Sequence, residues 1–304
     1  METTNKNLKK LEKYFIAGID FMVDKNGKVY FIEANSVPGL FRSLEKKYKN
    51  DKIFLEIKKE IGQNKYLFIY NEKNYNEVES RYKIKKFKKY FGKNNCAVKI
   101  ITDLKTDSIK NCVSEITKAD TKAIIYTPFL KIKKELTKKN YSYVFNPYPL
   151  AKLTIDKTIL YSKLHSTKNF QIPLSYHFKT KTELLKIIKN KKLNNCVIKP
   201  RFGQKGKNIF IIDEPKQIKN IKLKKDNWIL QEKIEINKIK NKFYDIRALA
   251  INGTFFNCVG RMSKNPVVNV SLGGKTFVID KNTKKKIKLA TEDVIKQINK
   301  LIKK

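Results

Sequence analysis

The chain is poor in the residues that most often build metal and redox sites. Its 304 residues include only four cysteines and two histidines. Cys96, Cys112, Cys196 and Cys258 lie far apart and form no C-x-x-C pair, so we expect buried thiols in a reducing compartment. Because both histidines are far from every cysteine in the sequence, the pattern argues against a zinc site.

Long apolar segments and two common nucleotide-binding motifs are also absent. No uninterrupted apolar run reaches the length of a membrane span, and the first ten residues, METTNKNLKK, lack the apolar region of a signal peptide. We therefore expect a soluble, cytoplasmic protein. Neither G-x-G-x-x-G nor G-x-x-x-x-G-K-[ST] occurs, so nothing supports a dinucleotide-binding motif or a Walker A loop.

Arginine is scarce although the chain is strongly basic. The formal net charge is +40, yet the 68 basic residues include only five arginines, and the lysines are spread through every segment. A nucleic-acid interface would concentrate its cations and favour arginine, so the composition argues against a dedicated nucleic-acid function. A polyanion-binding basic protein stays open as an alternative. Arg201, Arg247 and Arg261 lie within the motifs described below, where a planar bidentate donor is expected.

Apolar periodicity predicts an alternation of helices and strands. We expect helices over 5–16, 52–62, 75–91, 107–119, 153–164 and 180–190 and from 291 onward, and strands over 65–70, 97–102, 122–129, 142–149 and 170–178. The alternation between 63 and 150 predicts a small parallel, Rossmann-like sheet. An Asn252-Gly253 turn between two apolar runs predicts a hairpin over 244–265.

The most informative stretch is GIDFMVDKNGKVYFIEANSVPG, residues 18–39. Two apolar runs flank the turn residues Asp24-Lys25-Asn26-Gly27 and predict a β-hairpin. Glu33 and Asn35 are two positions apart and share a strand face, and strand pairing can bring Asp20 beside them. Oxygen ligands on rigid strands suit Mg²⁺ when phosphates complete its shell, so we predict these three residues as metal ligands. A plain hairpin with carboxylates at its edge is the alternative.

A second informative stretch is NCVIKPRFGQKGKNIFIID, residues 195–213. A strand delivers Lys199, Pro200 ends it, and Gly203 and Gly206 shape the loop that follows. Glycines let backbone N–H groups close over phosphate oxygens while Lys199 adds a point charge, so we predict a phosphate-binding loop. An ordinary glycine hairpin is the alternative.

Together these stretches resemble the ATP-grasp ligases. The pattern G-[IV]-D, a turn, and E-x-N-x-x-P-G within 18–39 is similar to the metal-binding end of that superfamily, and V-x-K-P-x-x-G-x-x-G at 197–206 is similar to its lid. The resemblance implies that Lys157 and Lys199 contact ATP phosphates. It also implies that Arg247 and Arg261 stabilise the transferring phosphoryl group or a tetrahedral oxyanion. Further cofactor contacts are implied for Gly203, Gly206, Gln231, Glu232, Lys233, Ile234, Glu235 and Asn269, with Glu232 or Glu235 on the ribose.

The order of the motifs differs from that superfamily, because the metal-binding hairpin comes first here and near the end there. The late motifs, D-x-R at 245–247, Arg261 and N-x-x-x-G-G at 269–274, resemble the YheC/YheD type associated with spore coats and, more loosely, the RimK type. The implied fold is α/β (α+β ATP-grasp), with a permuted two-lobed ATP-grasp domain and a small Rossmann-like preATP-grasp domain that helps shape the substrate cleft. We expect a C-terminal-type segment over 1–62, the preATP-grasp domain over 63–150 and the nucleotide-binding lobes over 151–304.

Two origins explain this order: a circular permutation, or a slice of a tandem array. We expect the hairpin to complete the site within one chain, with completion in a homodimer as the alternative to a monomeric site.

The activity implied by the resemblance is ATP-dependent ligation. A substrate carboxylate attacks the γ-phosphate to give an acylphosphate and ADP, and an amine, or alternatively a thiol, then displaces phosphate. The implied cofactors are ATP and one or two Mg²⁺ ions, with Mn²⁺ as an alternative ion. The carboxylate and the amine are unidentified. A catalytically inactive relic that serves as a spore-coat or scaffold binding module is the rival hypothesis, with association with spores as its expected location.

Overall fold

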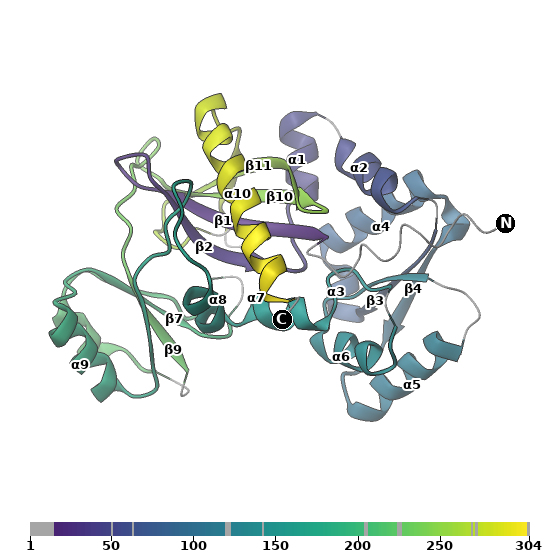
Figure 1. The fold of residues 1–304 in the computed structure, drawn as a ribbon, viewed down its shortest axis with the longest axis horizontal. Coiled ribbons are helices and arrows are strands. Elements are labelled where there is room, and N and C mark those ends of the chain that lie inside the picture. The colour runs from purple at the N-terminus through teal and green to yellow at the C-terminus, as the bar shows by residue number, and fades with distance from the viewer. Residues whose placement is uncertain are drawn as a thin grey trace.

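Three β-sheets organise the described part of the chain, residues 15–302 apart from 50, 63, 119–122, 142, 204–205, 224–226, 269 and 271–272 (Figure 1). The structure is a computed structural model. It is a mixed α/β fold, as the sequence predicts, with two antiparallel sheets and one parallel sheet. Figure 1 shows the purple β1 and β2 beside the yellow-green β10 and β11, although these pairs come from opposite ends of the chain.

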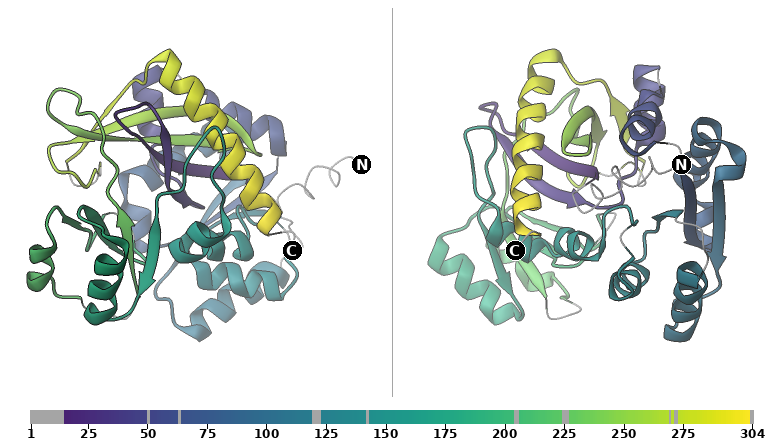
Figure 2. Two further views of the ribbon diagram at one scale, coloured as in Figure 1. Left: turned by 60° about the vertical axis from the view of Figure 1, so that its left-hand side comes forward. Right: turned by 45° about the vertical axis from the view of Figure 1, so that its right-hand side comes forward.

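The first sheet joins the N-terminal hairpin to late strands in the order β12-β11-β10-β1-β2. Its strands are β1 Ile16–Val23, β2 Val29–Asn35, β10 Phe243–Ile251, β11 Thr254–Ser263 and β12 Lys275–Phe277. Ile19 and Phe21 pack in the same core as Ile287 and Val294 of α10, Lys281–Leu301, which crosses this sheet in Figure 2. Because side chains alternate along a strand, Asp20 points to the opposite face.

The parallel sheet has the order β4-β3-β5 and lies between two layers of helices. Phe68 packs with Phe54 and Phe87 on one face, and Ile69 packs with Ile109 and Ile132 on the other. The elements of this region are α1 Phe41–Tyr48, α2 Lys52–Ile61, β3 Lys65–Asn71, α3 Glu72–Asn76, α4 Val78–Phe91, η2 Lys93–Asn95, β4 Cys96–Ile101, α5 Thr106–Lys118, β5 Ala123–Tyr126 and α6 Leu130–Lys138.

The third sheet, β6-β9-β7-β8, is antiparallel and carries α9 on its core side. Leu184 of α9 packs there with Ile198 and Trp228. Two short helices connect this unit to the parallel sheet. The elements are α7 Tyr148–Ile155, α8 Lys157–Lys163, β6 Ser175–Phe178, α9 Lys181–Lys191, β7 Cys196–Pro200, β8 Phe210–Ile212, η3 Pro215–Asn220 and β9 Trp228–Glu232.

Most predicted elements are confirmed, and the exceptions have local causes. The single helix predicted over 153–164 is wrong: Asp156 interrupts it and caps α8 by accepting from the N–H groups of Thr158 and Ile159. The strand predicted over 142–149 reduces to an isolated bridge at Val144. Helix α6 was not predicted, and the last helix begins at Lys281, ten residues before the predicted start. Of the helix predicted over 5–16, residues 5–14 lie outside the described residues, and Ile16 begins β1 instead.

Asn146 fastens the hairpin to the parallel-sheet region. Its side chain is buried and bonds the N–H groups of Phe15 and Ile16 at 2.9 and 3.3 Å and the carbonyls of Ile16 and Ser36 at 2.7 and 2.6 Å. One amide therefore satisfies four backbone groups at both ends of the hairpin.

None of the helices in the described residues combines the length and the apolar character needed to cross a bilayer.

Candidate active site

A cavity of about 1250 Å³ lies where the three sheets meet. It is bordered by the first sheet through Asp20 and Glu33, by the third through Lys199, and by the parallel-sheet region through Tyr70 and Lys83. It brings together all the predicted site residues that the structure describes: Asp20, Glu33, Asn35, Lys157, Lys199, Gly203, Gly206, Gln231, Glu232, Lys233, Ile234, Glu235, Arg247 and Arg261. Asn269, the remaining predicted residue, lies outside the described residues.

Asp20 lies at the centre of a buried ion-pair network. Arg247 donates to both of its oxygens at 2.5 Å, and Arg261 donates to one of them at 2.9 Å. Arg261 also forms a bidentate pair with Asp245, at 2.6 and 2.5 Å. The register explains the arrangement, because Asp20 pairs with Arg247 across β1 and β10 and Asp245 pairs with Arg261 across β10 and β11.

The network stabilises the charged forms of Asp20 and Arg261. Burial alone would raise the pKa of Asp20, but the guanidinium groups of Arg247 and Arg261 hold it well below its ordinary value. Burial would in turn lower the pKa of Arg261, and the carboxylates of Asp20 and Asp245 raise it instead. Two arginines are thus held in the cavity wall in one orientation, which suits them to a negative charge that develops beside them.

Glu33 and Asn35 fit a divalent cation better than Asp20 does. Asp20 and Glu33 are cross-strand partners, which confirms the predicted pairing. Glu33 is partly exposed and has looser contacts, 3.6 Å from Arg247 and 3.3 Å from the Asn35 amide. Asp20, by contrast, already accepts three hydrogen bonds from two guanidinium groups, one at Oδ1 and two at Oδ2, and these two positive charges disfavour a cation beside it. Within the described residues, no group of three histidine, cysteine or acidic side chains is arranged to hold a metal.

Lys199 is a buried amine held in place by two polar partners. Its Nζ donates to the Tyr161 hydroxyl at 2.6 Å and to Gln231 Oε1 at 2.8 Å, and it lies 4.7 Å from the centre of the Tyr161 ring. Burial lowers the pKa of Lys199 to about 8, while the charge of Glu33 opposes the shift. An anionic ligand beside this amine would favour its charged form.

Lys157 reaches the glycine loop from the first turn of α8. Its Nζ donates to the Gly203 carbonyl at 2.8 Å, and burial lowers its pKa. The loop is tied to the same helix by Arg201, which forms a bidentate pair with Asp156 at 2.8 and 2.6 Å. Asp156, which ends α7 and caps α8, therefore also positions the glycine loop.

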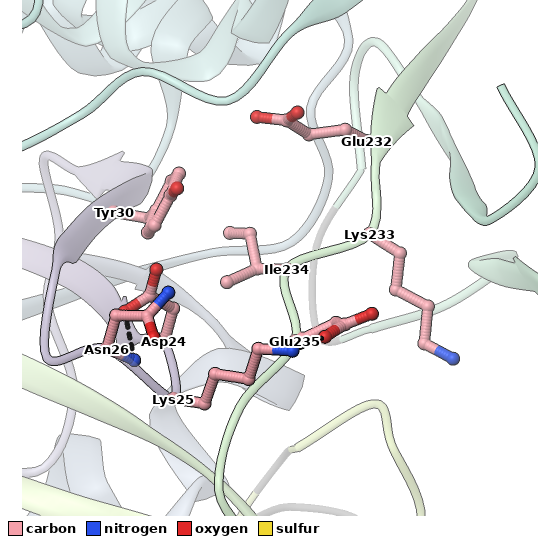
Figure 3. A pocket seen from close by; sticks show the side chains of 8 residues that line it. All are labelled: Asp24, Lys25, Asn26, Tyr30, Glu232, Lys233, Ile234 and Glu235. Atoms are coloured by element: carbon pink, nitrogen blue, oxygen red, sulfur yellow. Dashed lines mark hydrogen bonds and ion pairs between the residues drawn. The ribbon is translucent and has the colours of Figure 1, made fainter. Parts of the chain in front are cut away.

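The segment that follows β9, residues 233–235, lies against the turn of the N-terminal hairpin (Figure 3). Lys25 pairs with Glu235 at 2.7 Å, and its N–H donates to the Glu235 carbonyl at 3.0 Å. Figure 3 shows Glu232, Tyr30 and Ile234 around a smaller pocket at this edge. Glu232 accepts from the N–H of Leu174 at 3.0 Å. The hairpin therefore contributes to both ends of the cavity.

Several residues of this site were not singled out from the sequence. The D-x-R motif contains Asp245 but does not indicate its partner, because the pairing with Arg261 depends on the register of β10 and β11. The hydroxyl of Tyr161 accepts from Lys199 and donates to the Ile32 carbonyl. The position of Tyr161 in a helical pattern does not predict these contacts. Lys83 and Lys133 are buried in the cavity wall, but nothing in the sequence distinguishes them from the many exposed lysines.

Comparisons with known proteins agree with this architecture. Residues 154–303 match the family model of the ATP-grasp domain. A protein described as a gamma-glutamylcysteine synthetase from Methylobacillus flagellatus KT aligns over 99% of this chain and 97% of its own, with 10% identity and a TM-score of 0.56. The D-alanine–D-alanine ligase of Bacillus anthracis aligns over 78% of this chain and 79% of its own, with 15% identity and a TM-score of 0.51. At these identities the likeness concerns the fold. No curated protein matches the sequence.

Proposed function

We propose that this chain, whose membership of the ATP-grasp superfamily is supported by its family match and its fold, is an ATP-dependent ligase that joins a carboxylate to an amine or a thiol. The observation that carries the proposal is the convergence of two buried lysines, two fixed arginines and an open carboxylate on one cavity. Such a set suits a reaction in which phosphate charge must be held and a new charge stabilised.

The reaction has two group transfers. In the first, a carboxylate oxygen of the substrate attacks the γ-phosphorus of ATP, the bond to the bridging oxygen breaks, and ADP leaves. In the second, an amine or thiol attacks the acyl carbon, loses a proton and expels phosphate. Arg247 and Arg261 stabilise the charge that develops at the phosphoryl group or at the tetrahedral oxyanion. Asp20 is a positioning residue that holds both arginines.

Lys157, from the first turn of α8, and Lys199, from β7, bind the phosphates of ATP beside the glycine loop. Both amines are buried, and their present partners are neutral oxygens, so a phosphate oxygen would be a stronger acceptor for each. Residues 231–235 bind the adenosine part, with Glu232 or Glu235 on the ribose. Gly203 and Gly206 let the loop approach the phosphates closely and exclude water from the acylphosphate.

Glu33 and Asn35 would hold Mg²⁺, which neutralises phosphate charge when it is bound. The oxygen donors and the partial exposure of Glu33 favour these two residues. A direct bond from Asp20 to the metal would place the cation beside the guanidinium groups of Arg247 and Arg261, which repel it.

We also propose that the order of segments is a permutation of the usual one and that the site is completed within a single chain. The pairing of β1 with β10 and the four hydrogen bonds of Asn146 support this. A YheC/YheD-like affiliation is proposed only from the order of the late motifs.

The test is calorimetric titration of ATP with Mg²⁺ into size-fractionated protein, for the wild type, Glu33→Gln and Glu45→Gln. Glu45 is a matched control on α1, away from the cavity, where it pairs with Lys86. We expect Mg²⁺-dependent binding by the monomeric fraction, weakened about tenfold or more by Glu33→Gln and unchanged by Glu45→Gln.

Other outcomes would redirect the proposal. Binding confined to a dimeric fraction would contradict completion within one chain. No nucleotide binding in any fraction would favour a catalytically inactive relic. Salt-sensitive retention of polyanions without nucleotide binding would favour the polyanion-binding alternative.

A further inference from the structure

One arm of the cavity extends beyond the proposed reaction centre into the parallel-sheet region. It is lined by the end of the hairpin, by the first turns of α4 and by the ends of β3 and β5. Lys83 of α4, Tyr70 of β3 and Tyr126 of β5 form its inner wall. The proposed function uses none of these three residues.

Lys83 is a buried cation whose partners in this arm are all neutral. It is 5% exposed, donates to the Tyr126 hydroxyl at 2.7 Å and to the Pro38 carbonyl at 3.4 Å, and lies over the rings of Tyr126 and Phe41. It forms no ion pair with any residue that the structure describes. A buried ammonium group without a counter-ion is costly, so a bound anion would stabilise this arrangement.

Tyr70 offers a second donor, a hydroxyl without a well-aligned partner among the described residues. The residue is 2% exposed, and its ring lies 6.0 Å from that of Tyr126. Its hydroxyl lies near Ser80 and Tyr126 but makes no hydrogen bond of acceptable geometry with any described group. Buried hydroxyl groups are rarely left unpaired, so a donor of this kind indicates a missing acceptor.

Two acidic side chains, Glu77 and Glu79, also line this arm. Glu79 accepts from the N–H of Phe41 at 2.7 Å rather than from the ammonium group of Lys83. Two further basic side chains border the same cavity: Arg42, which is exposed, and Lys133, whose Nζ is held by the carbonyls of Phe145 and Asn146.

The hairpin limits the distance between this arm and the metal-binding end of the proposed reaction centre. Asn35, beside Glu33, lies only three positions before Pro38, whose carbonyl contacts Lys83. Three extended residues span at most about 11 Å. A ligand of four to seven carbons can therefore reach from one end to the other.

We propose that the substrate carries a second anionic group, a carboxylate or a phosphate, which Lys83 and Tyr70 bind while the reacting carboxylate lies beside Arg247 and Arg261. This inference rests on the proposed function for the identity of the reaction centre. The second anion acts as a specificity determinant, because a substrate without it leaves Lys83 uncompensated.

The test compares dicarboxylates of four to seven carbons, succinate to pimelate, with the monocarboxylates of equal carbon number by calorimetry. The ω-phosphono acids of matching length distinguish a second phosphate from a second carboxylate. The proteins are the wild type, Lys83→Met, Tyr70→Phe and Lys85→Met. Lys85 is the matched control, because it is an exposed lysine on the same helix.

For both wild type and Lys85→Met, at least one dianion should bind tenfold or more tightly than the monocarboxylate of equal carbon number. Lys83→Met should weaken that dianion about 10- to 100-fold and Tyr70→Phe severalfold. The proposal is overturned if no dianion is preferred, or if Lys83→Met binds like Lys85→Met. Tyr70→Phe removes only an unpaired hydroxyl, so it keeps the test open if Lys83→Met does not fold. The titrations contain no ATP, so failure of nucleotide binding would affect the proposed function alone.

Discussion

Asp20 and Arg247 lie 227 positions apart in the sequence and are joined by two hydrogen bonds of 2.5 Å. Arg261 binds the same carboxylate, so a single acidic group orients two cations in the cavity wall. This relationship divides the roles of the hairpin carboxylates. Asp20 is neutralised by two arginines of the protein, whereas Glu33 has looser contacts and keeps capacity for a ligand.

Replacing Asp20 by Asn should therefore destabilise the fold rather than act only on cofactor binding. Losing one member of a buried ion pair leaves its partner uncompensated, and we expect a loss of about 3–5 kcal/mol in the free energy of unfolding. Urea unfolding measures this free energy. Adding Arg247→Met to the Asp20→Asn variant should recover part of the loss, because it removes an uncompensated cation. A loss below about 1 kcal/mol would instead indicate that Asp20 is free to bind a metal.

Lys199→Met should separate ligand binding from stability. The amine is 5% exposed, and its burial already disfavours the charged form, so an apolar side chain of similar length should leave the melting temperature unchanged or raised. Affinity for ATP should fall about 10- to 100-fold, because a charge-assisted hydrogen bond is lost. Calorimetry and thermal unfolding on the same samples measure both quantities. A large fall in stability at unchanged affinity would assign Lys199 a purely structural role.

Asn146→Ala should loosen the hairpin. The substitution removes four hydrogen bonds to buried or half-buried backbone groups, and we expect a cost of roughly 2–5 kcal/mol. Hydrogen exchange of the β1 amides should accelerate. Asn140→Ala is the matched control, because Asn140 has nearly the same left-handed backbone, φ 54° against 52°, and is exposed. Equal effects of the two substitutions would attribute the change to backbone strain and contradict a fastening role.

Lys133 should make stability depend on pH above neutrality. Burial lowers its pKa from 10.5 to about 7, so between these values the unfolded chain binds a proton that the folded chain lacks. The free energy of unfolding should therefore rise with pH, by about 1 kcal/mol per unit between pH 7 and 9. Relative to wild type, Lys133→Met should lose this rise, and Lys134→Met, which changes an exposed neighbour, should keep it. Parallel curves for wild type and Lys133→Met would show that the amine titrates normally.

The sequence predicted the local parts of the site well and its long-range contacts poorly. The two-residue period of a strand was enough to place Glu33 and Asn35 on one face, with Asp20 opposite Glu33. It could not show that β10 lies on the other side of β1 and supplies the arginines that occupy Asp20. Likewise, the break at Asp156 depends on a capping interaction that a helical pattern does not reveal, because the apolar positions continue through it.

The lysines illustrate a second limit. Lys157 and Lys199 were selected through motifs, and both prove to be buried in the cavity wall. Lys83 and Lys133 have no motif around them, and in so lysine-rich a chain only burial distinguishes them. Because so many exposed lysines surround these two buried ones, neither their positions nor the net charge of +40 indicates where an anion binds.

The position of β1 between β2 and β10 has a consequence for synthesis of the chain. A strand that begins at residue 16 must wait for its partner at residues 243–251 to leave the ribosome, so the sheet that bears the arginines forms after the parallel sheet. Until then the hairpin exposes the edge of an apolar strand that can pair with the β10 of another molecule. Exchange of hairpins between chains should then increase when many copies are synthesised close together, and rapid completion of the chain should favour the closed monomer.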